Sequence, residues 1–159
     1  MTSVAQVEQL MERIDQLESR NAMRDLVTAY CRGFDSGNYD QFLGIWWPDC
    51  VWNVGPPFGR FDGHAGIARA VKEVLWPVWR ETHHLTSNLG VTFDGPNDAH
   101  GVCDVDCMGA TRDDVVQMIG ATYRDHFQRR GSEWRIKRRD VTIHYFNPVP
   151  GAQMTAPKG

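Results

Sequence analysis

The sequence predicts an α+β domain in which helices cover one face of a cone-shaped, curved antiparallel sheet. Two observations predict it. Apolar residues recur at helical spacing through much of the first half of the chain, whereas the second half alternates strand-forming residues between turn signals. A curved sheet with helices across its open end encloses a pocket, which is a common place for a small-molecule site.

The first 35 residues are expected to be helical. Residues 4–17 carry one amphipathic stripe and residues 23–34 carry a second. Ser19 is a candidate N-cap between the two stripes. We therefore expect two helices or one bent helix, with a leading helix at residues 1–18.

Shorter helices and longer strands follow in order. The expected elements are a helix over residues 39–46, a strand over 50–54, a turn over 55–59, a return strand over 60–63, a helix over 64–79 that Pro77 breaks, and strands over 82–93, 101–110, 115–129 and 133–145. The tail at 147–159 holds three prolines and two glycines and is expected to be extended. No internal repeat or linker divides the chain, so residues 1–159 are expected to form a single domain.

Composition narrows the class of protein. A 42% share of apolar residues in 159 residues suits one core, and a net charge of −3 gives no footprint for nucleic acid. The chain contains no run of eighteen apolar residues, so no membrane span is predicted, and the N-terminus lacks the pattern of a signal peptide. Four cysteines occur without Cys-x-x-Cys spacing. We therefore expect a cytoplasmic protein with free thiols, no metal site and no membrane or nucleic-acid partner.

Asp35 and His84 are the first candidates for chemistry. Asp35 directly follows the apolar face of a helix, where its carboxylate can reach toward whatever that face covers. We expect it to act on His84 at the bottom of an apolar pocket. Histidine suits proton abstraction because its ordinary pKa lies near working pH. The alternative is a core histidine held only by hydrogen bonds. His83 must face the other way on a strand, so only one of the two can enter the pocket.

Several stretches resemble a known family. The order of elements resembles the nuclear-transport-factor-2-like, or SnoaL-like, superfamily. From residue 19 onward, the stretches FLGIWWPDCVWNV, VLWPVWRETHHLTSNL, GATYRDHFQRRGSEWRI and HYFNPVPG resemble lindane dehydrochlorinase. Tyr30, Asp35 and His84 also sit where bile-acid 7α-dehydratase carries its tyrosine, aspartate and histidine, and scytalone dehydratase is a more distant relative.

The resemblance implies a cofactor-free lyase acting by general-base β-elimination. His84 would be the base, Asp35 would orient its ring, and Tyr30 would hydrogen-bond the leaving group or a substrate oxygen. Lindane dehydrochlorinase has lysine at the position of Tyr30, which favours an oxygen leaving group here over halide. The family's catalytic arginine falls on Arg139, but strict alternation would turn Arg138 inward instead. A β-bulge is needed to bring Arg139 to the inner face.

The substrate is expected to be a hydrophobic cyclic or aromatic small molecule, losing water or another small group such as formaldehyde or halide. The residues expected to bind it are Trp47, Trp52, Phe58, Trp76, Leu89, Met108 and Tyr123. Two alternatives stay open, an isomerase or cyclase that uses the same dyad and a non-catalytic binding module for a small molecule or protein. By resemblance we also expect a homo-oligomer, with a trimer favoured, assembled through the outer face of the sheet.

Overall fold

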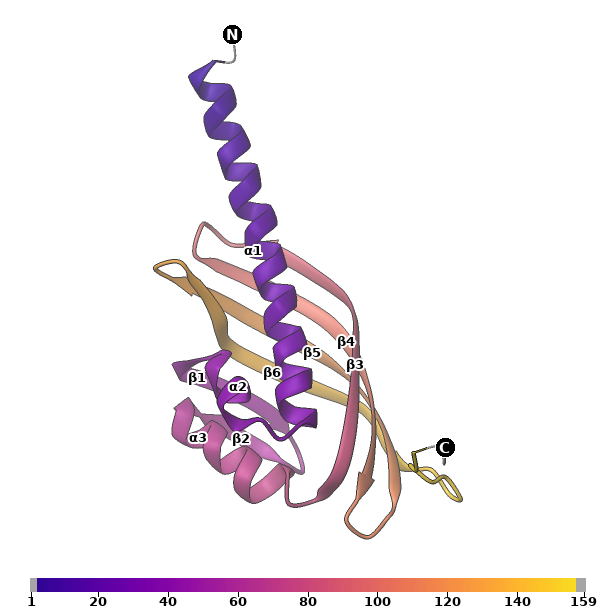
Figure 1. Cartoon of the computed structure of the whole chain (residues 1–159). Helices are drawn as coiled ribbons and strands as arrows, with labels where there is room; N and C mark the ends of the chain where they lie inside the picture. Colours follow the sequence, from indigo (N-terminus) through magenta and orange to yellow (C-terminus); the bar gives the residue numbers. More distant parts are fainter. Residues whose placement is uncertain (1–2, 157–159) are drawn as a thin grey trace.

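The computed structural model describes residues 3–156, in which a long helix lies across a curved sheet (Figure 1). The elements are α1 (Val4–Asp35), α2 (Tyr39–Gly44), β1 (Trp46–Gly55), β2 (Gly59–Asp62), α3 (Gly63–Arg69), the π-helix η1 (Ala70–Leu75), β3 (Trp79–Phe93), β4 (Asp98–Thr111), β5 (Val116–Arg130) and β6 (Glu133–Pro148). This arrangement confirms the predicted α+β cone. Among the described residues, no helix is both long enough and apolar enough to cross a membrane.

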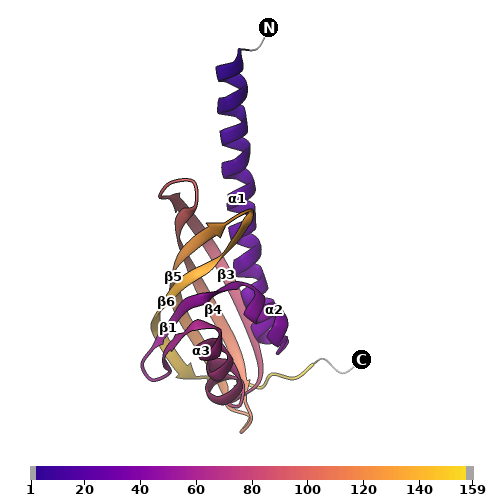
Figure 2. The same cartoon turned by 90° about the vertical axis from the view of Figure 1, so that its left-hand side faces the viewer.

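The sheet is open, with strand order β2-β1-β6-β5-β4-β3, and it curves strongly around the helices (Figure 2). All neighbours pair antiparallel except β1 and β6, which run parallel. This single parallel pairing joins the early β1–β2 hairpin to the end of the β3–β6 meander. It brings Trp52 opposite Arg139 and so places residues from both halves of the chain at one site.

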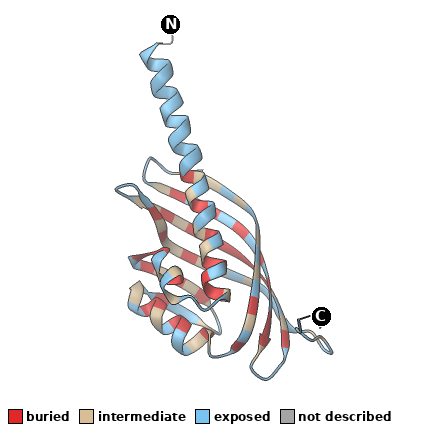
Figure 3. Ribbon diagram, in the orientation of Figure 1, coloured by how far each residue is buried: buried red, intermediate tan, exposed pale blue. Residues whose placement is uncertain are grey.

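Helix α1 is one continuous helix, so of the two alternatives for the first 35 residues the single helix is present and a separate leading helix is not. Ser3 caps its start, with a capping box to Gln6. Ser19 is buried in mid-helix, where its Oγ accepts a hydrogen bond of 3.0 Å from Trp134 Nε1–H. The part of α1 before Ser19 projects beyond the sheet and is exposed (Figure 3). Residues 1–2 lie outside the described part.

Three element boundaries differ from expectation. Trp46 opens strand β1 instead of ending a helix. The helix expected over residues 64–79 ends in the π-helix at Leu75, because Pro77 lacks the N–H that a further turn needs, and Trp79 opens β3. Strand β6 continues to Pro148, so the first two residues of the expected tail are in the sheet. Residues 157–159 of that tail lie outside the described residues.

A β-bulge in β6 decides which arginine turns inward. The register between β5 and β6 shifts where Ile136 pairs with Phe127 and Arg138 pairs with His126, so Lys137 is the extra residue. Trp134, Ile136 and Arg139 are buried in consequence. Arg138 faces outward and pairs with Asp140. The bulge that the inward position of Arg139 requires is therefore present.

The core lies between the inner face of the sheet and the helices α1, α2 and α3, where buried residues gather (Figure 3). Aromatic side chains dominate it. The ring centroid of Tyr30 lies 5.1 Å from that of Phe42, 5.9 Å from that of Trp52 and 5.4 Å from that of Tyr123. Edge-to-face packing at such distances stabilises rings beyond the area they bury. This aromatic cluster forms a rigid floor beneath the candidate site.

Candidate active site

Asp35 and His84 form a hydrogen-bonded pair. The Nδ1 atom of His84 lies 2.5 Å from Asp35 Oδ1. The backbone N–H of His84 donates to Asp35 Oδ2 over 2.8 Å, and the hydroxyl of Thr82 donates to Oδ1 over 2.7 Å. The carboxylate is thus held at both oxygens, and Nδ1 of His84 is engaged. The other ring nitrogen, Nε2, is left to act on a ligand.

Local structure explains this pairing. Asp35 is the last residue of α1, and the chain then turns at Gly37, whose φ of 64° suits glycine. Thr82 and His84 are two residues apart on β3 and therefore point to the same face. His83 points the other way, is 64% exposed and pairs with Glu81. The prediction that only one of the two histidines faces inward is confirmed.

The electrostatics of the pair favour a charged carboxylate. Burial alone would raise the pKa of Asp35, but the hydrogen bonds and charge of His84, with the hydroxyl of Thr82, hold that pKa below its usual value. Asp35 therefore stays ionised at neutral pH. An ionised carboxylate at Nδ1 fixes the ring tautomer and offsets positive charge that forms on the imidazole.

His84 opens onto an apolar cavity of about 80 Å³. The cavity is lined by Tyr30, Phe34, Trp52, Val54, Phe58, Leu75, Trp79, Thr82, His84, Val105, Cys107, Ile119, Ala121, Tyr123, Val141, Ile143 and Phe146. Within the described part of the chain, no Lys, Arg, Asp or Glu belongs to this lining. Phe146 is 37% exposed and packs on Phe58 with ring centroids 5.8 Å apart, so these two rings border the cavity mouth.

Tyr30 also contacts the dyad. Its ring is edge-on to that of His84, with centroids 6.1 Å apart and planes at 88°. Helix α1 stays helical through Asp35, so Tyr30 and Asp35 do not converge by unwinding of the helix end. The two side chains instead reach His84 from different sides, Tyr30 over its face and Asp35 at its Nδ1 edge.

Arg139 lies behind the cavity wall. Its guanidinium is fully buried and is bound through Nε and Nη2 to both oxygens of Asp125, each over 2.7 Å. Its Cζ is 4.2 Å from the ring centroids of both Tyr30 and Tyr123. Burial would lower the pKa of Arg139, but the charge and hydrogen bonds of Asp125 outweigh it and raise that pKa. Arg139 is therefore a permanent cation stacked on two rings that face the cavity.

The seven residues expected to bind substrate divide into those that line the cavity and those that do not. Trp52, Phe58 and Tyr123 line the cavity as predicted. Trp47 does not, because β1 turns alternate residues inward from Trp46, and Trp47 is instead stacked by Arg130 and Arg135 while it donates to the carbonyl of Gln128. These three partners of Trp47 lie on the face of β1 that is opposite the cavity.

Trp76, Leu89 and Met108 also lie outside the cavity, contrary to expectation. Trp76 packs on Phe34 from the other side, with ring centroids 6.2 Å apart. Leu89 follows a register shift in β3 and lines a separate groove beside α1. Met108 is 42% exposed on the outer sheet face, because alternation in β4 turns its neighbour Cys107 inward.

Two functional contacts were missed from the sequence although a signal for each was present. Thr82 shares the strand face of His84, so it could be expected at the dyad. Asp125 shares the inner face of β5 with Tyr123, and a buried arginine requires a carboxylate partner. The aliphatic walls from β4 and β6 depend on how those strands pair, which local sequence does not show.

A hydrogen-bonded carboxylate–imidazole pair at an apolar cavity of a cone fold is an arrangement typical of enzymes that act on small molecules. Comparison with known proteins agrees. The SnoaL-like domain family matches residues 15–140. Hexachlorocyclohexane dehydrochlorinase 1 of Sphingobium indicum is 30% identical over 148 residues, which cover 92% of this chain and 96% of that protein.

Solved structures give the same result. Hexachlorocyclohexane dehydrochlorinase LinA-type3 from Novosphingobium barchaimii is 29% identical with a TM-score of 0.86, over 91% of this chain and 99% of that one. A scytalone-dehydratase-like protein of Novosphingobium aromaticivorans shares the fold at 17% identity and a TM-score of 0.78, over 89% and 94%. The chain belongs to the SnoaL-like family. Its dehydrochlorinase relatives are lyases, and it is an enzyme of that general kind.

Proposed function

We propose that the protein is a cofactor-independent lyase that catalyses general-base β-elimination on a hydrophobic cyclic or aromatic small molecule. The observation that carries this proposal is the hydrogen-bonded pair of Asp35 and His84 at the wall of an otherwise apolar cavity. Nε2 of His84 takes a proton from carbon, and Asp35 offsets the charge of the imidazolium that results. Without that partner a buried imidazolium would be strongly disfavoured.

An oxygen leaving group suits the lining better than a halide does. A departing hydroxyl needs a proton, whereas a halide leaves as a stable anion. Tyr30, whose ring lies against that of His84, supplies an O–H group in the cavity lining, and burial raises its pKa, which keeps it protonated. Both proton transfers of a dehydration therefore have a side chain to perform them, and no cofactor is required.

Halide elimination is the second candidate, because the dehydrochlorinase relatives bear names of that activity. The same dyad serves both reactions, and only the group that assists departure differs. Proton transfer without departure would make the protein an isomerase or cyclase. A non-catalytic binding module would need neither Asp35 nor His84.

The cavity constrains the size of the substrate. Its volume of about 80 Å³ is smaller than the roughly 150 Å³ of an engineered cavity that holds benzene. A substituted ring therefore fits only if part of it extends through the mouth or if the rings of Phe58 and Phe146 move apart. We propose that these two rings shift when substrate enters.

The test is a panel of cyclic β-hydroxy ketones and chlorinated cyclohexanes, assayed with wild type and His84→Ala in D2O. Loss of water, followed by product mass and ultraviolet absorption, is the expected result, and His84→Ala should lose it by at least about 100-fold. Chloride release alone would replace the oxygen leaving group by halide. Deuterium uptake into a substrate that loses no water or chloride would favour an isomerase. Turnover by His84→Ala equal to that of wild type would overturn the role of the Asp35–His84 pair.

A homo-oligomer, with a trimer favoured, is a further proposal. The outer face of the sheet exposes Leu85, Met108 and Met118, and the last two are directly paired across β4 and β5. Large apolar side chains exposed on one sheet face are typical of a subunit contact. The exposed apolar stripe of α1 before Ser19 offers a second surface for a neighbouring subunit.

A further inference from the structure

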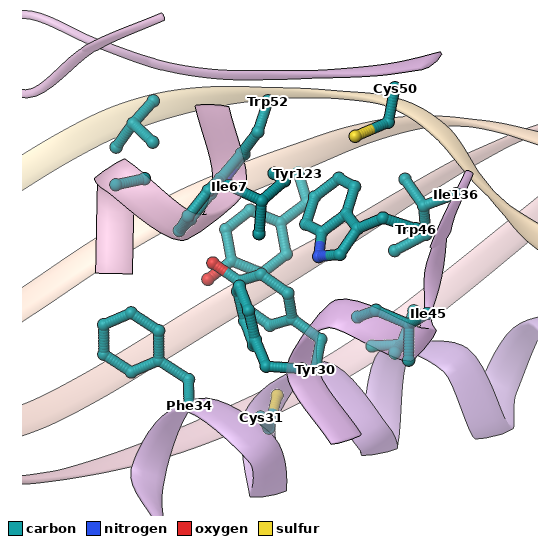
Figure 4. Close-up of a cluster of buried hydrophobic side chains, with 14 of the residues drawn as sticks. Tyr30, Cys31, Phe34, Ile45, Trp46, Cys50, Trp52, Ile67, Tyr123 and Ile136 are labelled. Atoms are coloured by element: carbon teal, nitrogen blue, oxygen red, sulfur yellow. The ribbon is translucent and has the colours of Figure 1, made fainter. Parts of the chain in front are cut away.

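Tyr30 and Tyr123 bring two hydroxyl groups together at the cavity. They come from α1 and β5, yet their ring centroids are 5.4 Å apart at 70°, and their oxygens lie side by side in Figure 4. Both residues line the cavity, although only 3% and 4% of their surfaces are exposed. The floor of an apolar cavity thus carries a compact pair of phenol groups.

Burial keeps both hydroxyl groups protonated. It raises the pKa of both residues, and the charge of Arg139 offsets part of the rise. When two phenol groups meet, one O–H can be shared between their oxygens and the other stays available to a third group. Tyr30 is the member of the pair whose ring also lies against His84, so its O–H is the one that we assign to a ligand.

The ion pair beneath the rings makes negative charge on Tyr30 less unfavourable. Arg139 is held at Nε and Nη2 by Asp125, and its Cζ lies equally close to both rings. Among the described residues, its Nη1 has no hydrogen-bond partner. The arginine therefore acts on the tyrosine pair as a fixed charge, at a place that water does not screen.

We propose that Tyr123 is a positioning residue that directs the proton of Tyr30 to an oxygen of the substrate, so that the site selects ring compounds with a hydroxyl group β to the acidic C–H bond. This inference rests on the proposed elimination. The geometry that supports it is the adjacency of the two tyrosine rings to each other, of the Tyr30 ring to His84, and of both rings to the cation of Arg139.

The proposed elimination of water uses one proton acceptor and one proton donor. Nε2 of His84 takes the proton from carbon, the C–H electrons form the double bond, and the C–O bond breaks. The departing oxygen takes the proton of Tyr30 and becomes water. Tyr30 is left as a phenolate that Tyr123 and Arg139 stabilise, and the departing water carries the proton from His84 back to it. The substrate loses one water, and the enzyme returns to its starting state.

A binding experiment tests the pair without knowledge of the substrate. The probes are 4-nitrophenol and nitrobenzene, measured below the pKa of 4-nitrophenol so that both are uncharged. They share a ring and a nitro group and differ in one hydroxyl. Tyr123→Phe keeps the ring against Arg139 and removes only the donor. We expect it to weaken 4-nitrophenol binding by about tenfold, the loss of one hydrogen bond, and to leave nitrobenzene binding unchanged. His84→Ala should keep the preference for 4-nitrophenol.

Equal weakening of both probes by Tyr123→Phe, or no preference for 4-nitrophenol in wild type, would overturn the proposal. Tyr30→Phe removes the other end of the pair and gives the same measurement if Tyr123→Phe does not fold. Failure of the proposed elimination mechanism can be told apart from failure of the tyrosine-pair proposal. In the first case turnover would be independent of His84 while the preference for 4-nitrophenol persists. On the hydroxylated substrate, Tyr123→Phe should lower kcat by about tenfold with KM little changed, and chloride elimination, which needs no proton from Tyr30, should fall by less.

Discussion

Asp35 binds His84 twice, at the backbone N–H over 2.8 Å and at Nδ1 over 2.5 Å. The first contact ties the end of α1 to strand β3, and the second orients the imidazole. Because one carboxylate makes both, the position of the helix end and the direction of the base are coupled.

Asp35→Asn should lower kcat by about 10² to 10⁴-fold with a small change in KM. The amide keeps the size of the side chain but cannot offset the charge of an imidazolium, and it can present an N–H to Nδ1 and so favour the wrong tautomer. Steady-state kinetics on the substrate that the panel identifies will measure this. Thr82→Val, which removes one hydrogen bond to Asp35 and no charge, is the matched control and should lose less than about tenfold. Equal kinetics for Asp35→Asn and wild type would contradict the dyad.

Stability should depend on the ionisation of Asp35 at acid pH. Its pKa is lower in the folded protein than the value near 4 of an unfolded chain, so its contribution is fully present above about pH 4 and is lost as pH falls through the folded pKa. Urea unfolding of wild type and Asp35→Asn between pH 6 and 2 will test this. The difference in free energy of unfolding should shrink as pH falls. Glu12→Gln, on the exposed part of α1, controls for the loss of one charge, and a constant difference for Asp35→Asn would argue against the linkage.

Arg139→Met should destabilise the fold by about 3–5 kcal/mol, because it leaves Asp125 buried without its partner. Arg138→Met is the matched control one residue away. Its side chain is 42% exposed, and its pair with Asp140 contributes about 0–1 kcal/mol. The double variant Asp125→Leu/Arg139→Met should be less destabilised than the two single changes added together. Urea denaturation measures all four proteins, and similar values for Arg138→Met and Arg139→Met would refute the inward position of Arg139.

Ala121→Leu should block ligand binding without unfolding the protein. Ala121 lies in the cavity wall on β5, and three added carbons would fill much of a space of about 80 Å³. We expect 4-nitrophenol to bind at least about tenfold more weakly, while the change in stability stays within the 1–3 kcal/mol of overpacking. Titration and thermal unfolding provide the two measurements. Met118→Leu, on the outer face of the same strand, should change neither. Unaltered binding to Ala121→Leu would place the ligand elsewhere.

Met108→Glu should dissociate the proposed oligomer. A carboxylate at the centre of the outer apolar patch would be buried without a partner in any contact made through that face. Light scattering over a range of concentrations should give about three chain masses for wild type and one for the variant. Met11→Glu, on the exposed stripe of α1, distinguishes the sheet face from the helix as the contact. A wild-type monomer whose mass is independent of concentration would remove the proposal.

Much of the architecture was readable because it depends on local periodicity. Helical spacing over residues 23–34 and alternation in β4 follow from backbone geometry, so they appear in the residues themselves. The choice of His84 over His83 rests on the same alternation. The outward position of Met108 also follows from it, although Met108 was expected to bind substrate. The strand boundary moved at Trp46, which opens β1 instead of ending a helix, and Trp47 was misplaced because its side chain lies on the strand face opposite to that of Trp46 and Trp52.

The sequence by itself determined the α+β class, the order of the elements and the residue types of the dyad, because these depend on spacing and on side-chain chemistry. Tertiary structure decided what no local pattern contains. The bulge at Lys137 turned Arg139 inward, the parallel pairing of β1 and β6 set Trp52 opposite it, and the crossing of α1 over β5 brought Tyr30 to Tyr123. Trp52 and Arg139 are 87 positions apart (139 − 52), and Tyr30 and Tyr123 are 93 positions apart (123 − 30), so the geometry of these contacts depends on how the whole sheet pairs and curves.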